Sequence, residues 1–232
     1  GQCNTALGKN ALCANTTSLW NTAVGHSSML SNTTGCSNSA VGLYSLSSNT
    51  TGNSNVAFGY ESLLDNTTAG FNTAVGRFSL RSNTTASYNN AFGHGTLGLN
   101  TTGSENTGMG DSVLSNSTTA CFNTGFGSAA LNANTTGASN TAVGKNALLA
   151  NTTGNANIGI GYEAGCSLTT GIRNIAIGDQ ILATATTGCF NTVMGYAAAY
   201  ELTTGGCNIA IGSNAARAAS PFQITTQCNR IV

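Results

Sequence analysis

Residues 21–37 read NTAVGHSSMLSNTTGCS, and residues 38–54 read NSAVGLYSLSSNTTGNS. The second stretch repeats the first, and the same pattern continues in both directions along the 232-residue chain. The consensus is N-T-A-Φ-G-x-x-s-L-x-x-N-T-T-G-x-x, where Φ is a bulky apolar residue and s is a small one. A fixed period of this kind is interpreted first, because it determines the whole fold.

The opening Asn of the repeat recurs every 17 residues without an insertion. A Gly follows it four residues later in every copy, from Gly8 to Gly212. The thirteen opening positions are Asn4, Asn21, Asn38, Asn55, Asn72, Asn89, Asn106, Asn123, Asn140, Asn157, Asn174, Asn191 and Asn208. The repeats cover residues 4–224 and predict a single domain over residues 1–232. Residues 1–3 and 225–232 are then terminal part-coils that act as inter-subunit contacts or caps, with Cys228 in the Φ column.

The length of the repeat decides between helices and strands. A helical repeat needs about 30 residues or more for two helices and their turns. Frequent Gly and Asn would also interrupt any helix. Seventeen residues suit one turn of stacked short strands, with a rise of about 4.8 Å per turn. The sequence therefore predicts an all-β fold, a parallel β-solenoid (β-roll or β-helix) of thirteen 17-residue coils.

Stacking places equivalent residues in columns. We expect the opening Asn to form an amide ladder, and the recurrent Gly to occupy a corner with positive φ or a place of close approach. The Φ column is expected to form an apolar ladder inside the coil, facing the Leu column from Leu12 to Leu148. The residue before Φ is usually Ala and points away from Φ, which predicts either a tight internal bend or contact with a second chain.

The pentapeptides Asn174–Gly178 and Asn208–Gly212, both N-I-A-I-G, resemble the head repeats of trimeric autotransporter adhesins. The N-T-A-V-G copies also resemble repeats of phage and viral fibre proteins. The resemblance covers nearly the whole chain. It implies parallel β-rolls, often trimeric, that serve as surface stalks and adhesins.

A second Asn column carries the glycosylation signal Asn-x-Ser/Thr. Glycosylation is predicted for Asn15, Asn32, Asn49, Asn66, Asn83, Asn100, Asn116, Asn134 and Asn151. The alternative is that Asn-Thr-Thr is favourable corner chemistry. The last four repeats carry Leu168, Ala185, Leu202 and Ala219 in this column, which predicts a bare edge there and a hypothetical subunit contact.

The eight cysteines are even in number and favour an oxidising compartment. The disulfide candidates are Cys3, Cys13, Cys36, Cys121, Cys166, Cys189, Cys207 and Cys228. Cys189 and Cys207 lie one coil apart on adjacent columns and could pair with each other. Cys36 and Cys121 are five coils apart, about 24 Å, so bonds between chains or free buried thiols are the alternatives.

Composition and motifs exclude several functions. Seven basic residues balance seven acidic ones, which argues against a nucleic-acid partner and an electrostatic membrane anchor. No apolar run is long enough to insert into a membrane, and no nucleophile elbow or phosphate loop occurs. His26 and His94 lie four coils apart, about 19 Å, so they cannot share a metal ion. We expect no enzyme activity, cofactor or metal.

These observations favour a secreted structural subunit of an extracellular filament or fibre, located outside the cell or on a cell or virion surface. The expected partners are copies of the same chain, stacked head to tail, with glycans along one edge. An adhesin or receptor-binding fibre that recognises surface glycans is the alternative. An ice-binding protein is disfavoured because the two adjacent Thr columns face opposite ways.

Overall fold

A computed structural model of the chain describes residues 3–217, 228, 229 and 231. Its described residues form short strands, turns and loops, with no helix among them. The strands are three residues long and recur every 17 residues. They are β1 (Thr5–Leu7), β2 (Thr22–Val24), β3 (Ser39–Val41), β4 (Val56–Phe58), β5 (Thr73–Val75), β6 (Asn90–Phe92), β7 (Thr107–Met109), β8 (Thr124–Phe126), β9 (Thr141–Val143), β10 (Ile158–Ile160), β11 (Ile175–Ile177), β12 (Thr192–Met194) and β13 (Ile209–Ile211).

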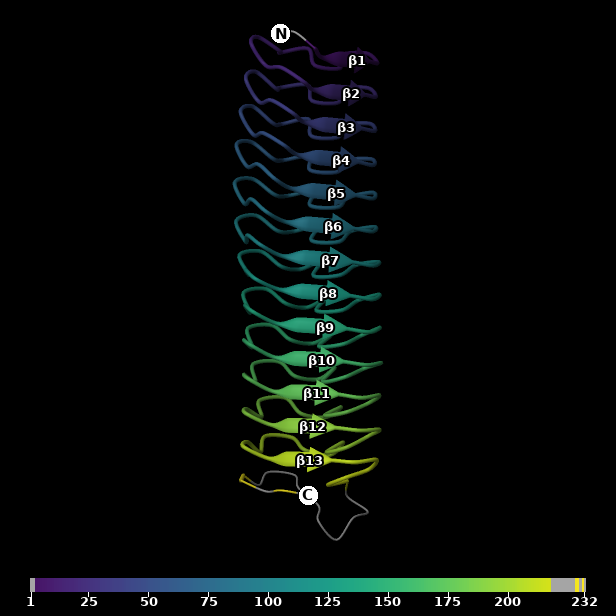
Figure 1. Ribbon diagram of the computed structural model, residues 1–232, viewed down its shortest axis with the longest axis vertical. Coiled ribbons are helices and arrows are strands. Elements are labelled where there is room, and N and C mark those ends of the chain that lie inside the picture. Colours follow the sequence, from purple (N-terminus) through teal and green to yellow (C-terminus); the bar gives the residue numbers. More distant parts are fainter. Residues whose placement is uncertain (1–2, 218–227, 230, 232) are drawn as a thin grey trace. The chain divides into compact units, whose positions relative to one another are not determined.

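The chain divides into two compact units, residues 1–120 with β1–β7 and residues 121–232 with β8–β13. Within each unit consecutive strands pair in parallel, and equivalent residues of neighbouring repeats face each other, as Val41 faces Phe58. The coils of each unit therefore stack one on another (Figure 1). The predicted β-solenoid is confirmed, and the single domain over residues 1–232 stays a prediction. We number coils from coil 1 (residues 4–20) and positions within a coil from 1 to 17.

The Gly at position 5 is required by two separate constraints. Gly42 has φ of 133°, a conformation that L side chains rarely adopt. A Cβ on Gly42 would lie 2.4 Å from the carbonyl oxygen of Gly59 in the next coil. Both expectations for this column, positive φ and close approach, are confirmed.

Other corners are made by residues that are not glycine. Positions 7, 9 and 17 adopt the left-handed conformation in most coils, as in Tyr44 (φ 57°), Leu46 (φ 50°) and Phe71 (φ 60°). Such a conformation costs roughly 1–2 kcal/mol per residue. Hydrogen bonds between equivalent corners of successive coils offset this conformational cost. One example is the bond from the Tyr44 N–H to the His26 carbonyl oxygen at 3.1 Å.

The interior is lined by Ala at position 3, small residues at position 8 and Leu at position 9. Ala57 and Leu63 are fully buried, whereas Phe58 at position 4 is 40% exposed. The prediction that the Φ column lies inside the coil is therefore wrong, and the prediction for the Leu column is confirmed. Strand residues alternate between faces, so an interior Ala at position 3 directs position 4 outward.

The Leu column explains why the strand presents a small residue to the interior. Gly159 replaces Ala at position 3 of coil 10, and a Cβ there would lie 2.8 Å from Cγ of Leu148. Coil 12 shows the reverse exchange of volume: its position 3 is Val193, and its position 9 is Ala199, both fully buried. The sizes at positions 3 and 9 are thus matched in these coils, in agreement with close packing of protein cores.

The opening Asn residues form the predicted ladder. The Asn38 N–H donates to Oδ1 of Asn21 at 2.9 Å, and Asn38 Nδ2 donates to the carbonyl of Gly52 in its own coil at 2.8 Å. The same backbone bond recurs through both units, up to Asn208 and Asn191. Each buried side chain therefore has partners in its own coil and in a neighbouring one, which a buried amide needs.

The C-terminal segment departs from the predicted register. Ile231 forms a parallel bridge with Ile209, a separation of 22 residues (231 − 209) instead of 17. The Gly206 N–H donates to Sγ of Cys228 at 3.4 Å, as the Leu19 N–H does to Sγ of Cys36. Cys228 thus lies at position 16, and its predicted place in the Φ column is wrong. Part of the β13 edge is occupied by this segment.

Candidate interaction surface

The outward face of each sheet carries two columns of uncharged side chains. Positions 2 and 4 of the strands point outward, and position 3 between them points inward. Position 2 is mostly Thr, and position 4 is the Φ residue. Neither column contains a charged residue in any of the thirteen strands. Charged residues are normally abundant on a surface that faces water, so a face without any differs from an ordinary solvated surface.

In the first unit the Φ residues form an unbroken ladder. The strand register pairs Leu7 with Val24 and continues through every strand to Phe92 and Met109. Phe58 is 40% exposed and Met109 is 46% exposed, with no other part of the unit covering them. At about 4.8 Å per strand the seven side chains extend over roughly 29 Å. We call these seven residues the apolar ladder: Leu7, Val24, Val41, Phe58, Val75, Phe92 and Met109.

The second unit repeats the ladder and widens it. Its Φ residues are Phe126, Val143, Ile160, Ile177, Met194 and Ile211, again in register from strand to strand. Position 2 is Ile158, Ile175 and Ile209 in three of these strands instead of Thr. The outward face is therefore more apolar here than in the first unit. Contiguous exposed apolar patches on soluble proteins commonly mark contact surfaces.

The predicted glycosylation column lies inside the coil. Seven of its residues are fully buried: Asn32, Asn49, Asn66, Asn83, Asn100, Asn134 and Asn151. Asn49 Nδ2 donates to Oδ1 of Asn32 at 2.7 Å and to the carbonyl of Gly52 at 3.0 Å. A glycan on this nitrogen would remove a donor and has no space within the stack. The glycan column is therefore incompatible with the fold at these seven residues.

The two remaining sequons differ from the seven. Asn15 is half-buried and its Oδ1 accepts a hydrogen bond from the Ser18 hydroxyl, while Asn116 lies at position 11 and is exposed. Glycosylation of these two residues stays a prediction. The apolar replacements Leu168, Ala185 and Leu202 are fully buried, so the predicted bare edge does not exist in the described coils. Ala219 lies outside the described residues.

The buried Asn column is interrupted in coil 7, and this interruption gives a stability prediction. Oδ1 of Asn100 is buried without a partner because the next coil carries Ser117 at position 12, and the Ser117 hydroxyl also lacks one. Ser117→Asn would supply the missing Nδ2 donor. We expect the free energy of unfolding to rise by about 1–2 kcal/mol, as measured by chemical denaturation. A matched Ser115→Asn change at half-buried position 10 should leave it within about 0.5 kcal/mol, and equal effects would contradict the proposed pairing.

The structure contains no disulfide within the chain, so the pairing of Cys189 with Cys207 is absent, and bonds between chains stay a prediction. All eight cysteines are free, including Cys189 and Cys207, which are joined only by a backbone hydrogen bond at 2.9 Å. Cys36 and Cys189 instead accept backbone N–H groups through their sulfur atoms. Burial raises the pKa of the Cys166 thiol, which lowers its thiolate fraction and its reactivity toward oxidation.

The comparisons with known proteins return no match among family models, curated proteins or solved structures. Among the described residues no helix is long and apolar enough to cross a membrane.

Proposed function

We propose that the protein is a structural subunit of an extracellular fibre and that copies of the chain associate side by side along the apolar ladder. The observation that carries the proposal is the ladder itself, a column of large apolar side chains that the fold leaves exposed. The resemblance of the repeats to fibre and adhesin heads supports the same role. No enzymatic role is proposed.

The periodicity of the ladder favours a second copy of the chain as its partner. Each strand presents one Φ side chain, and neighbouring strands are about 4.8 Å apart. A partner must offer apolar groups at the same spacing to contact every rung. A copy of this chain has that spacing by construction, and its outward face is also uncharged. Homo-oligomers built from such self-complementary surfaces are common.

Side-by-side association is favoured over simple head-to-tail stacking. Head-to-tail stacking needs free backbone groups at the terminal strand, and those of β13 are partly engaged by the bridge from Ile231 to Ile209. The apolar ladder needs no such edge, because the contacts are made by side chains that point outward from the sheet. Lateral association along the ladder is therefore proposed in place of the head-to-tail stacking expected from the open ends of a solenoid.

The test is a double substitution, Val41→Lys together with Phe58→Lys, which places two positive charges on the apolar ladder. These side chains are 37% and 40% exposed, so the free energy of unfolding should change by less than about 1 kcal/mol per site. Burying two like charges against a second copy costs several kcal/mol. We therefore expect the association constant, measured by sedimentation over a range of concentrations, to fall by about 100-fold or more.

The matched control is Thr51→Lys with Thr68→Lys. Both residues are exposed, lie in the same two coils and add the same charge away from the ladder. This variant should associate like the unmodified chain. A monomeric unmodified chain at every concentration, or equal association of the two lysine variants, would show that the ladder is not the contact.

A further inference from the structure

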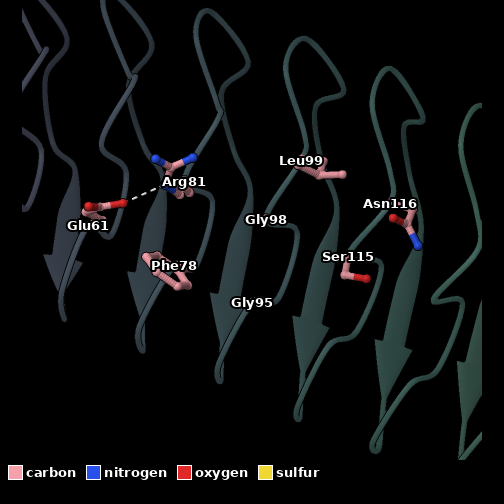
Figure 2. Close-up of a pocket in the computed structure, with 8 residues that line it drawn as sticks. All are labelled: Glu61, Phe78, Arg81, Gly95, Gly98, Leu99, Ser115 and Asn116. Atoms are coloured by element: carbon pink, nitrogen blue, oxygen red, sulfur yellow. Dashed lines mark hydrogen bonds and ion pairs between the residues drawn. The ribbon is translucent and has the colours of Figure 1, made fainter.

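A groove crosses the loops that follow the strands in the first unit (Figure 2), and none of its lining residues belongs to the apolar ladder. It has a volume of about 330 Å³. Residues from four successive coils line it: Glu61, Phe78, Arg81, Gly95, Gly98, Leu99, Ser115 and Asn116. This volume is at the lower end of the range for small-molecule sites, which is about 300–1,000 Å³.

The groove exists because one coil lacks side chains where its neighbours have them. Positions 7 and 10 are Phe78 and Arg81 in coil 5 but Gly95 and Gly98 in coil 6. Figure 2 shows the two glycines between the side chains of coil 5 on one side and Ser115 and Asn116 on the other. A gap one coil wide is thus left open between the side chains of coil 5 and those of coil 7.

One wall of the groove is an aromatic ring with aromatic and cationic neighbours. The Phe78 ring contacts the Tyr60 ring edge-on, with centroids 5.4 Å apart. The Arg77 guanidinium lies over the Phe78 ring, 4.3 Å from its centroid, in a cation–π contact that favours this ring orientation. Leu99, which is 51% exposed, adds apolar carbon further along the groove.

The charged residues of the groove neutralise each other. Arg81 Nε lies 2.6 Å from a carboxylate oxygen of Glu61. Hydrogen bonds from the Tyr60 hydroxyl and from Arg81 lower the pKa of Glu61, so its carboxylate is ionised at neutral pH. The groove therefore combines an apolar wall with donors and acceptors and has no net charge. Such a lining gives no electrostatic advantage to a charged ligand.

We infer that this groove binds an uncharged saccharide. A pyranose ring presents a face of C–H groups that can pack on Phe78 and Leu99. Its hydroxyl groups both donate and accept, which suits the Arg81 guanidinium, the Glu61 carboxylate and the polar groups of Ser115 and Asn116. The openness of the groove to solvent limits the buried area, so affinities near the millimolar range are expected.

The experiment uses the whole chain and saturation-transfer NMR. The probes are the methyl glycosides of glucose, galactose, mannose and N-acetylglucosamine, together with cellobiose. We expect transfer to the ring C–H protons of at least one probe. Gly98→Arg should weaken that binding by about tenfold or more, because an Arg side chain already occurs at this repeat position in Arg81 and Arg217 and would fill the gap.

The matched control is Asn132→Arg, which makes a similar change at position 10 of coil 8 in the second unit. It should bind the sugar like the unmodified chain, and both variants should keep the same melting curve and sedimentation. The inference is overturned if no probe receives saturation, if Gly98→Arg binds as well as the control, or if sodium glucuronate binds more tightly than methyl glucoside. None of these outcomes depends on the lateral association proposed above.

Discussion

Gly76→Ala is expected to lower the free energy of unfolding by about 3 kcal/mol or more, a large effect for the addition of one methyl group. Gly76 has φ of 127°, outside the regions open to L residues. A Cβ there would lie 2.5 Å from the carbonyl oxygen and 2.7 Å from the carbonyl carbon of Gly93. Both are backbone atoms of the next coil, so no side chain can rotate away to relieve the contact.

The control for this prediction is Gly95→Ala in the neighbouring coil. Gly95 has φ of 63°, the conformation that Phe78 and other residues adopt at the same repeat position. The nearest atom to its added Cβ is the Ser112 hydroxyl oxygen, 3.9 Å away. We expect this change to shift stability by less than about 1 kcal/mol in chemical denaturation. Equal effects of the two substitutions would show that coil contact does not determine the need for glycine.

The fold could be predicted from the sequence because stacking leaves a direct record in the period. The Asn and Gly columns are constant from Asn4 and Gly8 onward, and both have the predicted structural role. The orientation of the strand could not be obtained in the same way. A three-residue strand such as Thr73–Val75 alternates between two faces, and the alternation does not say which face is inside.

The narrow interior determines which strand residues point inward. The sequence indicates this through the residue sizes at positions 3 and 9. Leu fills the interior at position 9, so position 3 is small, and coil 12 exchanges the two sizes with Val193 and Ala199. A compensating exchange of this kind indicates contact within the core. The exposed apolar ladder follows from the same fact, since every Ala that points inward places a large residue outside.

The buried Asn column could also have been recognised from its replacements. Its position is Asn in most coils but Leu168, Ala185 and Leu202 in three of the later ones. Ser117 is the polar exception, in coil 7. A column that exchanges amides for large apolar residues such as Leu is typical of the interior, not of a glycosylated edge. The groove, by contrast, depends on two glycines that the repeat alone does not distinguish from corner residues.

Asn66→Asp is expected to destabilise the protein by about 4 kcal/mol at neutral pH. Asn66 Nδ2 donates to Oδ1 of Asn49 at 2.8 Å and to the carbonyl of Ala69 at 3.0 Å, and the side chain is fully buried. A carboxylate would set a charged oxygen against two acceptors. Only its Oδ1, which accepts from Asn83, would keep a favourable contact.

The cost of Asn66→Asp should depend on pH in a defined direction. Burial and facing oxygens favour the neutral acid, so the pKa of the new carboxyl group rises above its unfolded value of about 3.9. The variant is then most stable relative to the unmodified chain below about pH 3.9, where the acid is neutral in both states. Its relative stability falls as the pH rises through the folded pKa, because the unfolded chain releases the proton more readily.

Asn53→Asp provides the comparison, because Asn53 is exposed and its Oδ1 accepts the Cys36 N–H at 2.7 Å. A carboxylate keeps that acceptor, so the change should stay within about 0.5 kcal/mol from pH 3 to pH 7. Denaturation curves for both variants over this range test the hydrogen bonds of the buried Asn column directly. If Asn66→Asp matched Asn53→Asp at every pH, the interior amides would not be joined from coil to coil, and the stacking of the solenoid would need another source of stability.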